Sequence, residues 1–296
     1  MKCIFIGGAD RSGTTLLASL LSCIEGSVVT PESLFKTEIT FEEPINTIEY
    51  SKKLNLNPNF KRWNVDLSNL NNIKHKDYKE YYSNLLCQYK PDKKIRYWID
   101  HIPNNLRYSR QLNDVFDDCF FIHIVRDGRA VANSQISLEW GANTFLAAAK
   151  DWMNKLLYGA VTENLFPTRT ISIRYEDLLD DQSPTIKSIL DFIGIKETNE
   201  TKSIDSSFLP EFTKSQHSLV GKGPDRSRSM DWKSKLSTQN IADYQYYAGD
   251  ILMQMGYELV DTKNTKVTKS HLVRETFKEL WFKKVINPSR YIRNRR

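Results

Sequence analysis

A short loop near the N-terminus has residues of the types and spacing that bind phosphate. The segment GADRSGTT places Gly8 and Gly13 at the G-x-x-x-x-G spacing of a P-loop, directly after a short apolar run. Backbone N–H groups at such a helix start can surround an anion, and Arg11 adds a positive charge. A nucleoside triphosphatase has lysine after the second glycine, but here the residue is Thr14. The loop is therefore predicted to bind a single phosphate or a sulfonate-bearing group, with a plain strand-to-helix turn as the alternative.

A second candidate anion site follows the apolar run CFFIHIV, residues 119–125. Arg126 comes directly after this run, and Ser134 lies about two turns into the helix that we expect to follow. Ligands of open parallel sheets bind at the carboxyl ends of the strands, where an arginine and a hydroxyl can hold a phosphate. We therefore expect Arg126 and Ser134 to bind a phosphate, with a salt bridge from Arg126 to Asp127 or Asp177 as the alternative.

Strands that alternate with helices must position these residues. Apolar runs predict strands at residues 2–7, 28–30, 95–99, 119–125 and 169–175. Helical spacing predicts helices that begin near Gly13 and Ala130, and others at residues 183–193, 239–255 and 272–285. This alternation indicates a three-layer α/β fold with a mainly parallel sheet. Residues 36–94 and 198–229 lack clear periodicity, and we expect them to carry function or short helices.

Composition excludes several classes of protein. A chain of 296 residues with 40% hydrophobic residues can form a substantial core, so disorder, collagen and coiled coil are ruled out. No apolar run approaches the ~20 residues of a membrane-spanning helix, and the N-terminus does not fit a signal peptide. Four cysteines without metal or redox spacing are expected to be reduced core thiols. We therefore expect a soluble, cytoplasmic protein.

The positive charge is concentrated in the C-terminal tail. The formal net charge is +6, yet residues 1–273 contain equal numbers of basic and acidic side chains. The expected domains are therefore a main domain at 1–260 and a basic amphipathic helix and tail at 261–296. Such a tail could contact an anionic membrane or an acidic acceptor, and the alternative is a helix docked on the body with a solvated basic end. A neutral body gives no reason to expect a nucleic-acid partner.

Both candidate loops resemble one known family. The run RSGTTL after paired glycines resembles the 5′-phosphosulfate loop of sulfotransferases that use 3′-phosphoadenosine 5′-phosphosulfate (PAPS), most closely the bacterial and tyrosylprotein branch. The run VRDGRAVANS resembles the 3′-phosphate segment of that family, with Arg126 and Ser134 at the matching positions. The resemblance covers residues 2 to about 257. It implies a P-loop-like fold with a sheet of about five strands and PAPS as cosubstrate. No metal is expected, because the five histidines show no ligand spacing and the aspartates lack the EF-hand pattern.

The resemblance also assigns roles to individual residues. Glu32, after the strand predicted at 28–30, would be the catalytic base, although a helix-capping role is the alternative. His101 stands where the family often has a lysine for the leaving oxygen, and it would be either a protonated acid or a neutral spacer beside Arg11. The expected cosubstrate contacts are Arg11, Ser12, Gly13, Thr14, Thr15, Arg126, Ser134, Tyr175, Lys222, Arg226 and Arg228.

The expected activity is sulfuryl transfer to a hydroxyl group. The acceptor pocket is expected to be lined by residues 33–75 and 135–152, and a protein tyrosine, a glycan, a lipid or a small molecule all fit as acceptor. A P-loop nucleotide kinase or hydrolase is the first alternative, and Thr14 in the lysine position disfavours it. The second is a non-catalytic module that binds polyanions or membranes through its basic tail. The sequence predicts no oligomeric state.

Overall fold

Five parallel strands form the centre of the protein. The computed structural model describes residues 1–38, 44–136, 138–196 and 227–286. The strands lie in the order β2-β3-β1-β4-β5, and every neighbouring pair is parallel. Their bounds are β1 (Lys2–Gly8), β2 (Ser27–Val29), β3 (Tyr97–Asp100), β4 (Cys119–Val125) and β5 (Thr170–Arg174). The prediction of a mainly parallel sheet of about five strands is confirmed.

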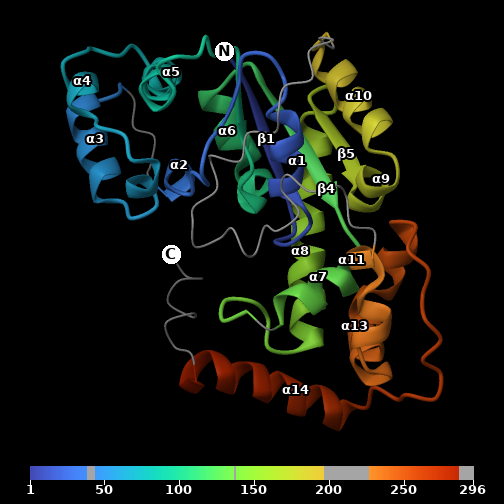
Figure 1. Ribbon diagram of the computed structural model, residues 1–296. Helices are drawn as coiled ribbons and strands as arrows, with labels where there is room; N and C mark the ends of the chain where they lie inside the picture. The colour runs from blue at the N-terminus through green and yellow to red at the C-terminus, as the bar shows by residue number, and fades with distance from the viewer. Residues whose placement is uncertain (39–43, 137, 197–226, 287–296) are drawn as a thin grey trace.

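Alternate residues of β1 belong to two different cores. Cys3 and Phe5 pack into an aromatic core on one face of the sheet, whereas Ile4 and Ile6 pack into an aliphatic core on the other. A central parallel strand is covered on both faces, which explains why its sequence is apolar throughout rather than alternating. The two cores give the predicted three-layer arrangement (Figure 1).

Helices cover both faces of the sheet. The aliphatic core includes side chains of α1 (Thr14–Leu21), α9 (Tyr175–Asp180) and α10 (Gln182–Ile193). The aromatic core includes side chains of α5 (Tyr78–Tyr89), the 3-10 helix η2 (Pro103–Tyr108) and α6 (Ser109–Val115). Strand β3 begins two residues later than predicted, and all five strands otherwise lie within two residues of their expected ends.

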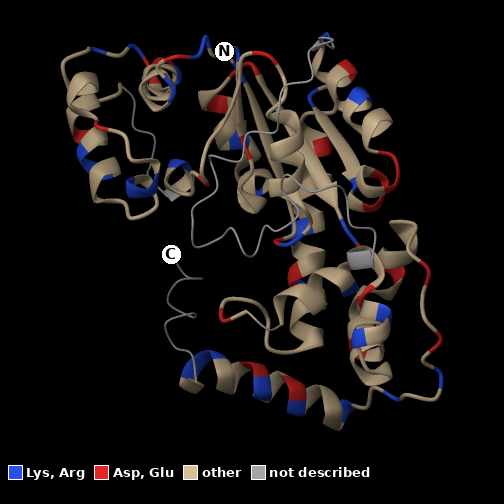
Figure 2. Ribbon diagram, viewed as in Figure 1, with Lys and Arg blue, Asp and Glu red and all other residues tan. Residues whose placement is uncertain are grey.

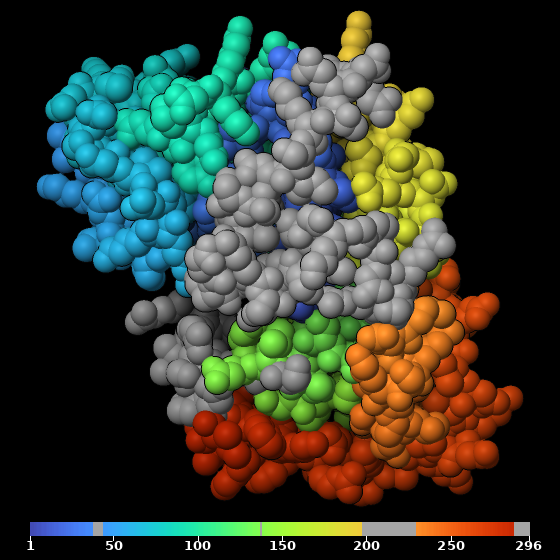
Figure 3. Space-filling model, viewed as in Figure 1, coloured from blue at the N-terminus to red at the C-terminus, as the bar shows by residue number. Residues whose placement is uncertain are grey.

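The first segment without clear periodicity, residues 36–94, forms short helices, as expected, whereas most of the second, residues 198–229, lies outside the described residues. The short helices are α2 (Phe35–Glu38), α3 (Thr47–Leu56), η1 (Phe60–Trp63), α4 (Ser68–Asn71) and α5. Their aromatic side chains join the sheet: Tyr82 stacks on Trp98 of β3 with 5.3 Å between ring centroids. These helices form a lobe beside the sheet, drawn in blue-green in Figure 3.

A further group of helices extends the protein at the carboxyl end of the sheet, and one of them, α8 (Phe145–Leu165), also runs along the face that carries the aromatic core. They comprise α7 (Gly128–Gln135), α8, α11 (Ser227–Met230), α12 (Trp232–Lys235), α13 (Thr238–Gln254) and α14 (Lys269–Trp281). A third core, which includes Trp152 and Tyr244, joins α7, α8 and α13. Helix α14 lies along the outer edge and continues into a π-helical turn, η4 (Phe282–Ile286) (Figure 1). Within the described ranges, no helix has the length and apolar character needed to cross a membrane.

Candidate functional site

The loop between β1 and α1 has the geometry of an anion-binding turn. Gly13 and Arg11 both have left-handed backbone conformations, with φ of 105° and 71°. Gly13 is the N-cap of α1 and has no side chain that could accept hydrogen bonds from the first helical turn, so these N–H groups can face an anion. The Ser12 hydroxyl is buried and has no hydrogen-bond partner among the described residues. The segment from Arg11 to Thr15 is therefore a P-loop-like turn rather than an ordinary capped connection.

The two predicted anion sites meet in space. The Arg11 Nε atom donates a hydrogen bond to the Ser134 hydroxyl of α7 over 3.0 Å. The Arg126 Nη1 atom donates to the backbone carbonyl of Arg11 over 2.9 Å, and the Gln135 side chain donates to that of Asp10. The loop after β1 and the segment after β4 thus form one assembly, although they lie more than a hundred residues apart in the chain.

Tyr175 packs against both parts of this assembly. The guanidinium of Arg126 stacks over its ring at 4.5 Å from the centroid. The other contact is with Gly13, where an added Cβ atom would lie 2.4 Å from the ring of Tyr175. Tyr175 is buried at the first position of α9, so it fixes the loop and Arg126 relative to each other.

Asp127 pairs with Arg129. It is therefore not the partner of Arg126 that the alternative prediction of a salt bridge named. Arg129 is buried, and its Nε and Nη2 atoms donate to the two carboxylate oxygens of Asp127 over 3.0 and 2.8 Å. The same guanidinium stacks on Trp232 and donates to the backbone carbonyl of Glu258. Arg129 therefore connects α7 to the C-terminal helices. Sequence reasoning missed this role, because nothing in the local pattern distinguishes Arg129 from Arg126.

Glu32 lies between β2 and α2, beside the loop. Its side chain is exposed to solvent, yet the protein packed around the carboxyl group disfavours the charged form and raises its pKa from 4.5 to about 7. The nearby carboxylates Asp10 and Asp100 add to this increase in pKa. Helix α2 begins at Phe35, so Glu32 lies outside the first helical turn and the capping alternative is not supported. A carboxyl group that titrates near neutral pH is suited to proton transfer.

A buried ion pair lies next to Glu32. The Lys36 ammonium is fully buried and donates to Asp100 Oδ1 over 3.1 Å and to Asn105 Oδ1 over 2.7 Å. The Ser33 hydroxyl also donates to the Asp100 carboxylate. Burial lowers the pKa of Lys36. This cluster anchors the segment that carries Glu32 to the end of β3. Sequence reasoning missed it, because its members belong to segments that come together only in the fold.

His101 is buried directly after β3. Burial lowers its pKa from 6.5 to about 4, and the opposing effect of Asp100 is smaller. The imidazole is therefore neutral near pH 7. Of the two roles predicted for His101, the geometry favours the neutral spacer over the protonated acid.

Lys155 of α8 brings a positive charge to the loop. Its ammonium lies 3.1 Å from Asp10 Oδ2 and also donates to Asn104, three residues after His101. The side chain is 11% exposed. Lys155 thus bridges the loop after β1 and the segment after β3, a contact that the sequence pattern does not indicate.

Three predicted residues cannot be placed at the level of side chains. Lys222 and Arg226 lie outside the described residues. Arg228 belongs to α11, which packs against α7, but only its backbone is described. Among the described residues, no group of His, Cys, Asp and Glu side chains could hold a metal ion.

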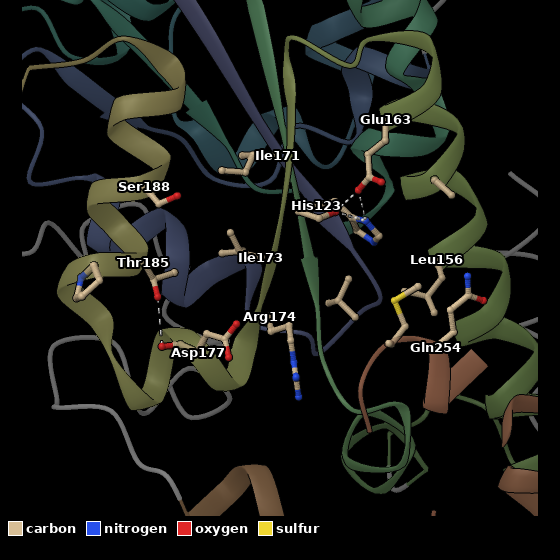
Figure 4. A pocket seen from close by; sticks show the side chains of 15 residues that line it. His123, Leu156, Glu163, Ile171, Ile173, Arg174, Asp177, Thr185, Ser188 and Gln254 are labelled. Atoms are coloured by element: carbon tan, nitrogen blue, oxygen red, sulfur yellow. Dashed lines mark hydrogen bonds and ion pairs between the residues drawn. The ribbon is translucent and has the colours of Figure 1, made fainter. Parts of the chain in front are cut away.

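A pocket of about 660 Å³ lies beside the edge strand β5, between α8 and α10 (Figure 4). His123, Glu163 and Ser172 lie on its wall, and both the hydroxyl and the carboxylate contact the same imidazole nitrogen, Nδ1. A catalytic triad needs the two groups on opposite nitrogens, so this cluster is not one. None of Arg11, Ser134 and Glu32 lines the pocket, so it is separate from the phosphate assembly.

Three solved sulfotransferase structures share this fold. The sulfotransferase domain of the Synechococcus PCC 7002 olefin synthase aligns with a TM-score of 0.59 at 21% identity, over 88% of this chain and 96% of that one. The sulfotransferase domain of the curacin biosynthetic pathway aligns with a TM-score of 0.56 at 16% identity, over 87% and 98% of the two chains. A Mycobacterium avium sulfotransferase aligns with a TM-score of 0.50 at 14% identity, over 86% and 77%. At these identities the likeness establishes the fold.

The sequence itself provides the family assignment. A search of curated protein sequences gave no match. The model of the sulfotransferase family matches residues 3–200, which include β1 to β5, the loop after β1, Glu32 and the Arg126 segment. The chain therefore belongs to the sulfotransferase family.

Proposed function

We propose that the protein transfers the sulfuryl group of PAPS to a hydroxyl group of an acceptor. One observation carries this proposal: Arg126, Arg11 and Ser134 are joined by hydrogen bonds at the carboxyl ends of β1 and β4. Two adjacent anion sites on one loop assembly suit a nucleotide with a phosphate at both its 3′ and 5′ positions. The family assignment favours this reaction over the nucleotide kinase or hydrolase alternative.

The chain offers a set of groups for each phosphate. Arg11 and the N–H groups and hydroxyls of Ser12, Gly13, Thr14 and Thr15 would hold the 5′-phosphosulfate. Arg126 and Ser134 would hold the 3′-phosphate, while Tyr175 orients the Arg126 guanidinium. Lys222, Arg226 and Arg228 are proposed to complete the 3′ site.

Glu32 is proposed as the catalytic base. The transfer breaks the bond between sulfur and the bridging phosphate oxygen and forms one between sulfur and the acceptor oxygen, while Glu32 takes the hydroxyl proton. A pKa of about 7 keeps a large fraction of Glu32 ionised at neutral pH and still allows it to hold the proton.

Positive side chains would stabilise the charge on the leaving phosphate. Arg11 lies in the loop itself, and Lys155 contacts the loop at Asp10. These two residues would replace the lysine that the family often has at the position of His101. Neutral His101 would then pack beneath the site without carrying charge.

The acceptor is proposed to bind between the short helices and the α7–α8 connection. We expect residues 33–75 and 135–152 to line this acceptor pocket, as predicted from the sequence. The proposed acceptor carries a hydroxyl group, and a tyrosine, a sugar and a lipid headgroup each satisfy the chemistry that Glu32 provides.

A thermal-shift series tests the nucleotide assignment. We expect 3′,5′-bisphosphoadenosine to raise the melting temperature more than AMP or ATP, because only it presents both phosphates to the assembly. The Arg126→Ala variant is expected to lose this stabilisation, since one charge-assisted hydrogen bond accounts for ~1.5–3 kcal/mol. Arg110→Ala, at an exposed position of α6, is the matched control. Equal shifts with all three nucleotides would exclude the proposal, and preferential stabilisation by ATP would favour the kinase alternative.

A further inference from the structure

Helix α14 contacts the body of the protein through its polar face. The Glu279 carboxylate accepts a hydrogen bond from the backbone N–H of Asn143 over 2.8 Å and another from its side chain over 3.2 Å. Near the start of the helix, His271 Nε2 lies 2.8 Å from Asp243 Oδ1 of α13. Glu275, on the same side of the helix as Glu279, is also largely buried. Polar contacts therefore hold α14 in place.

The apolar face of α14 points away from the body. Val273, Phe277, Leu280 and Trp281 are 69%, 66%, 47% and 49% exposed, and Val285 follows in η4 at 55%. Phe277 and Trp281 stack on each other with 6.4 Å between ring centroids. A helix that belongs only to the body normally buries its apolar side, so this orientation is the reverse of the usual one. Exposed apolar surface of this kind marks a docking site.

Basic side chains accompany the apolar face. The segment 269–286 carries Lys269, Arg274, Lys278, Lys283 and Lys284, and its two acidic residues are those turned toward the body. Figure 2 shows these charges along α14. Four further arginines follow in the sequence at positions 287–296, outside the described residues. The exposed surface is thus apolar in the middle and positively charged around it.

An anionic lipid surface matches the exposed face of α14 in both its apolar and its charged character. We propose that α14 lies in the interface of a negatively charged membrane, with Phe277 and Trp281 inserted and the basic side chains at the level of the headgroups. Aromatic and aliphatic residues beside lysines and arginines are the pattern of interfacial helices. A second copy of this chain fits less well, because pairing two such faces would bring two positively charged surfaces together.

Helix α14 lies at the end of the sheet where the proposed active site is located. The strands β1 and β4 end toward α7, and α14 lies beyond α7 at the same end of the sheet (Figure 1). A membrane bound by α14 would therefore face the end of the molecule that carries the phosphate loops.

Vesicle sedimentation with the full-length protein tests the proposal. We expect the protein to bind vesicles made of equal parts of phosphatidylcholine and phosphatidylglycerol, and to bind phosphatidylcholine vesicles at least about tenfold more weakly. Raising the salt concentration should weaken binding to the anionic vesicles. The Phe277→Ser/Trp281→Ser variant should bind the anionic vesicles at least about tenfold more weakly, because both side chains would otherwise be buried in the interface.

An equally exposed apolar pair provides the control. Leu157 and Val161 lie one turn apart on α8 at 58% and 45% exposure, so Leu157→Ser/Val161→Ser should leave vesicle binding unchanged. Circular dichroism melting confirms that both variants are folded. Equal binding to neutral and anionic vesicles, or equal losses in the two variants, would overturn the proposal. So would the absence of vesicle binding together with a dimer that the Phe277→Ser/Trp281→Ser variant abolishes, since the face would then join two copies of the chain.

Discussion

Charged side chains on the two sides of β1 differ in their partners and in their burial. On the side proposed to bind the nucleotide (the nucleotide side), formed by Arg11, Arg126 and Ser134, the arginines donate to a hydroxyl and to a backbone carbonyl, among other contacts. On the base side, formed by Glu32, Lys36, Asp100 and His101, charged groups are packed close to one another and most are fully buried. An anion can replace a hydroxyl or carbonyl partner easily, whereas a buried pair is costly to separate.

This difference suits one side to ligand binding and the other to shifting the pKa values of its own residues. On the nucleotide side, the Ser134 hydroxyl and the Arg11 carbonyl are neutral groups whose hydrogen bonds a bound anion could replace. The base side shifts the pKa values of Glu32, Lys36 and His101 through burial and mutual interaction. We therefore expect changes on the base side to alter rate and stability, and changes on the nucleotide side to alter affinity.

The largest expected effect belongs to Glu32. Replacing it with Gln removes the proposed base, so sulfuryl transfer should fall about 10²–10⁴-fold while stabilisation by 3′,5′-bisphosphoadenosine is unchanged. The wild-type rate should rise with pH through about 7, because Glu32 must be ionised to accept a proton. Release of the bisphosphate nucleotide from PAPS, measured with a panel of phenols and sugar alcohols, gives the rate. The exposed Glu25→Gln is the control. Loss of nucleotide binding in the Glu32→Gln variant would show that the two sides are not separable.

The Lys36→Met variant tests whether a buried pair holds the base side together. It leaves the Asp100 carboxylate buried without its cation, which should reduce the free energy of unfolding by about 3–5 kcal/mol in urea. Lys79→Met breaks a surface pair with Asp117 and should cost only about 0–1 kcal/mol. The double variant Lys36→Met/Asp100→Asn should recover part of the loss. Similar costs for Lys36→Met and Lys79→Met would show that the buried pair stabilises the base side no more than a surface pair does.

His101 is expected to make the fold sensitive to acid. Its folded pKa of about 4 lies below the ordinary 6.5, so the folded protein binds fewer protons here than the unfolded chain does between these values. The contribution of this site to the free energy of unfolding is fully present above pH 6.5. It falls by about 3 kcal/mol as the pH decreases from 6.5 to about 4. Glu32, whose pKa is raised, changes the stability of both proteins alike, so the test is the difference between them. From pH 6.5 to about 4 the free energy of unfolding of the wild type, measured in urea, should fall by about 3 kcal/mol more than that of His101→Gln. An unchanged slope would mean that the imidazole is not buried as a neutral group.

The smallest expected effect belongs to Ser134. Replacing it with Ala removes the hydrogen bond to Arg11 and one proposed phosphate contact, so affinity for 3′,5′-bisphosphoadenosine should fall about fivefold. Calorimetric titration measures this change, and Ser68→Ala at an exposed position of α4 is the control. The melting temperature without nucleotide should stay the same, since a change there would assign a structural role to this residue.

The nucleotide side could be predicted from the sequence, and the base side only in part. The glycines, Arg11 and Arg126 lie at strand ends in short contiguous motifs, and the parallel sheet then brings the motifs together. The Lys36–Asp100 pair and the contact of Lys155 with Asp10 join segments that local spacing does not relate. The shift in the pKa of His101 arises from tertiary burial, which no motif encodes. The orientation of α14 was also beyond prediction, because an amphipathic pattern does not say which face meets the body.

The contact between Gly13 and Tyr175 has an evolutionary consequence. A methyl group at position 13 would meet the tyrosine ring, and the ring in turn supports Arg126, so one substitution is transmitted to both loops. Mutational effects at positions 13, 126 and 175 should therefore be non-additive, with the cost of each depending on the residues at the other two. A substitution at any one of these three positions would therefore change which residues are tolerated at the other two, although the positions lie far apart in the sequence.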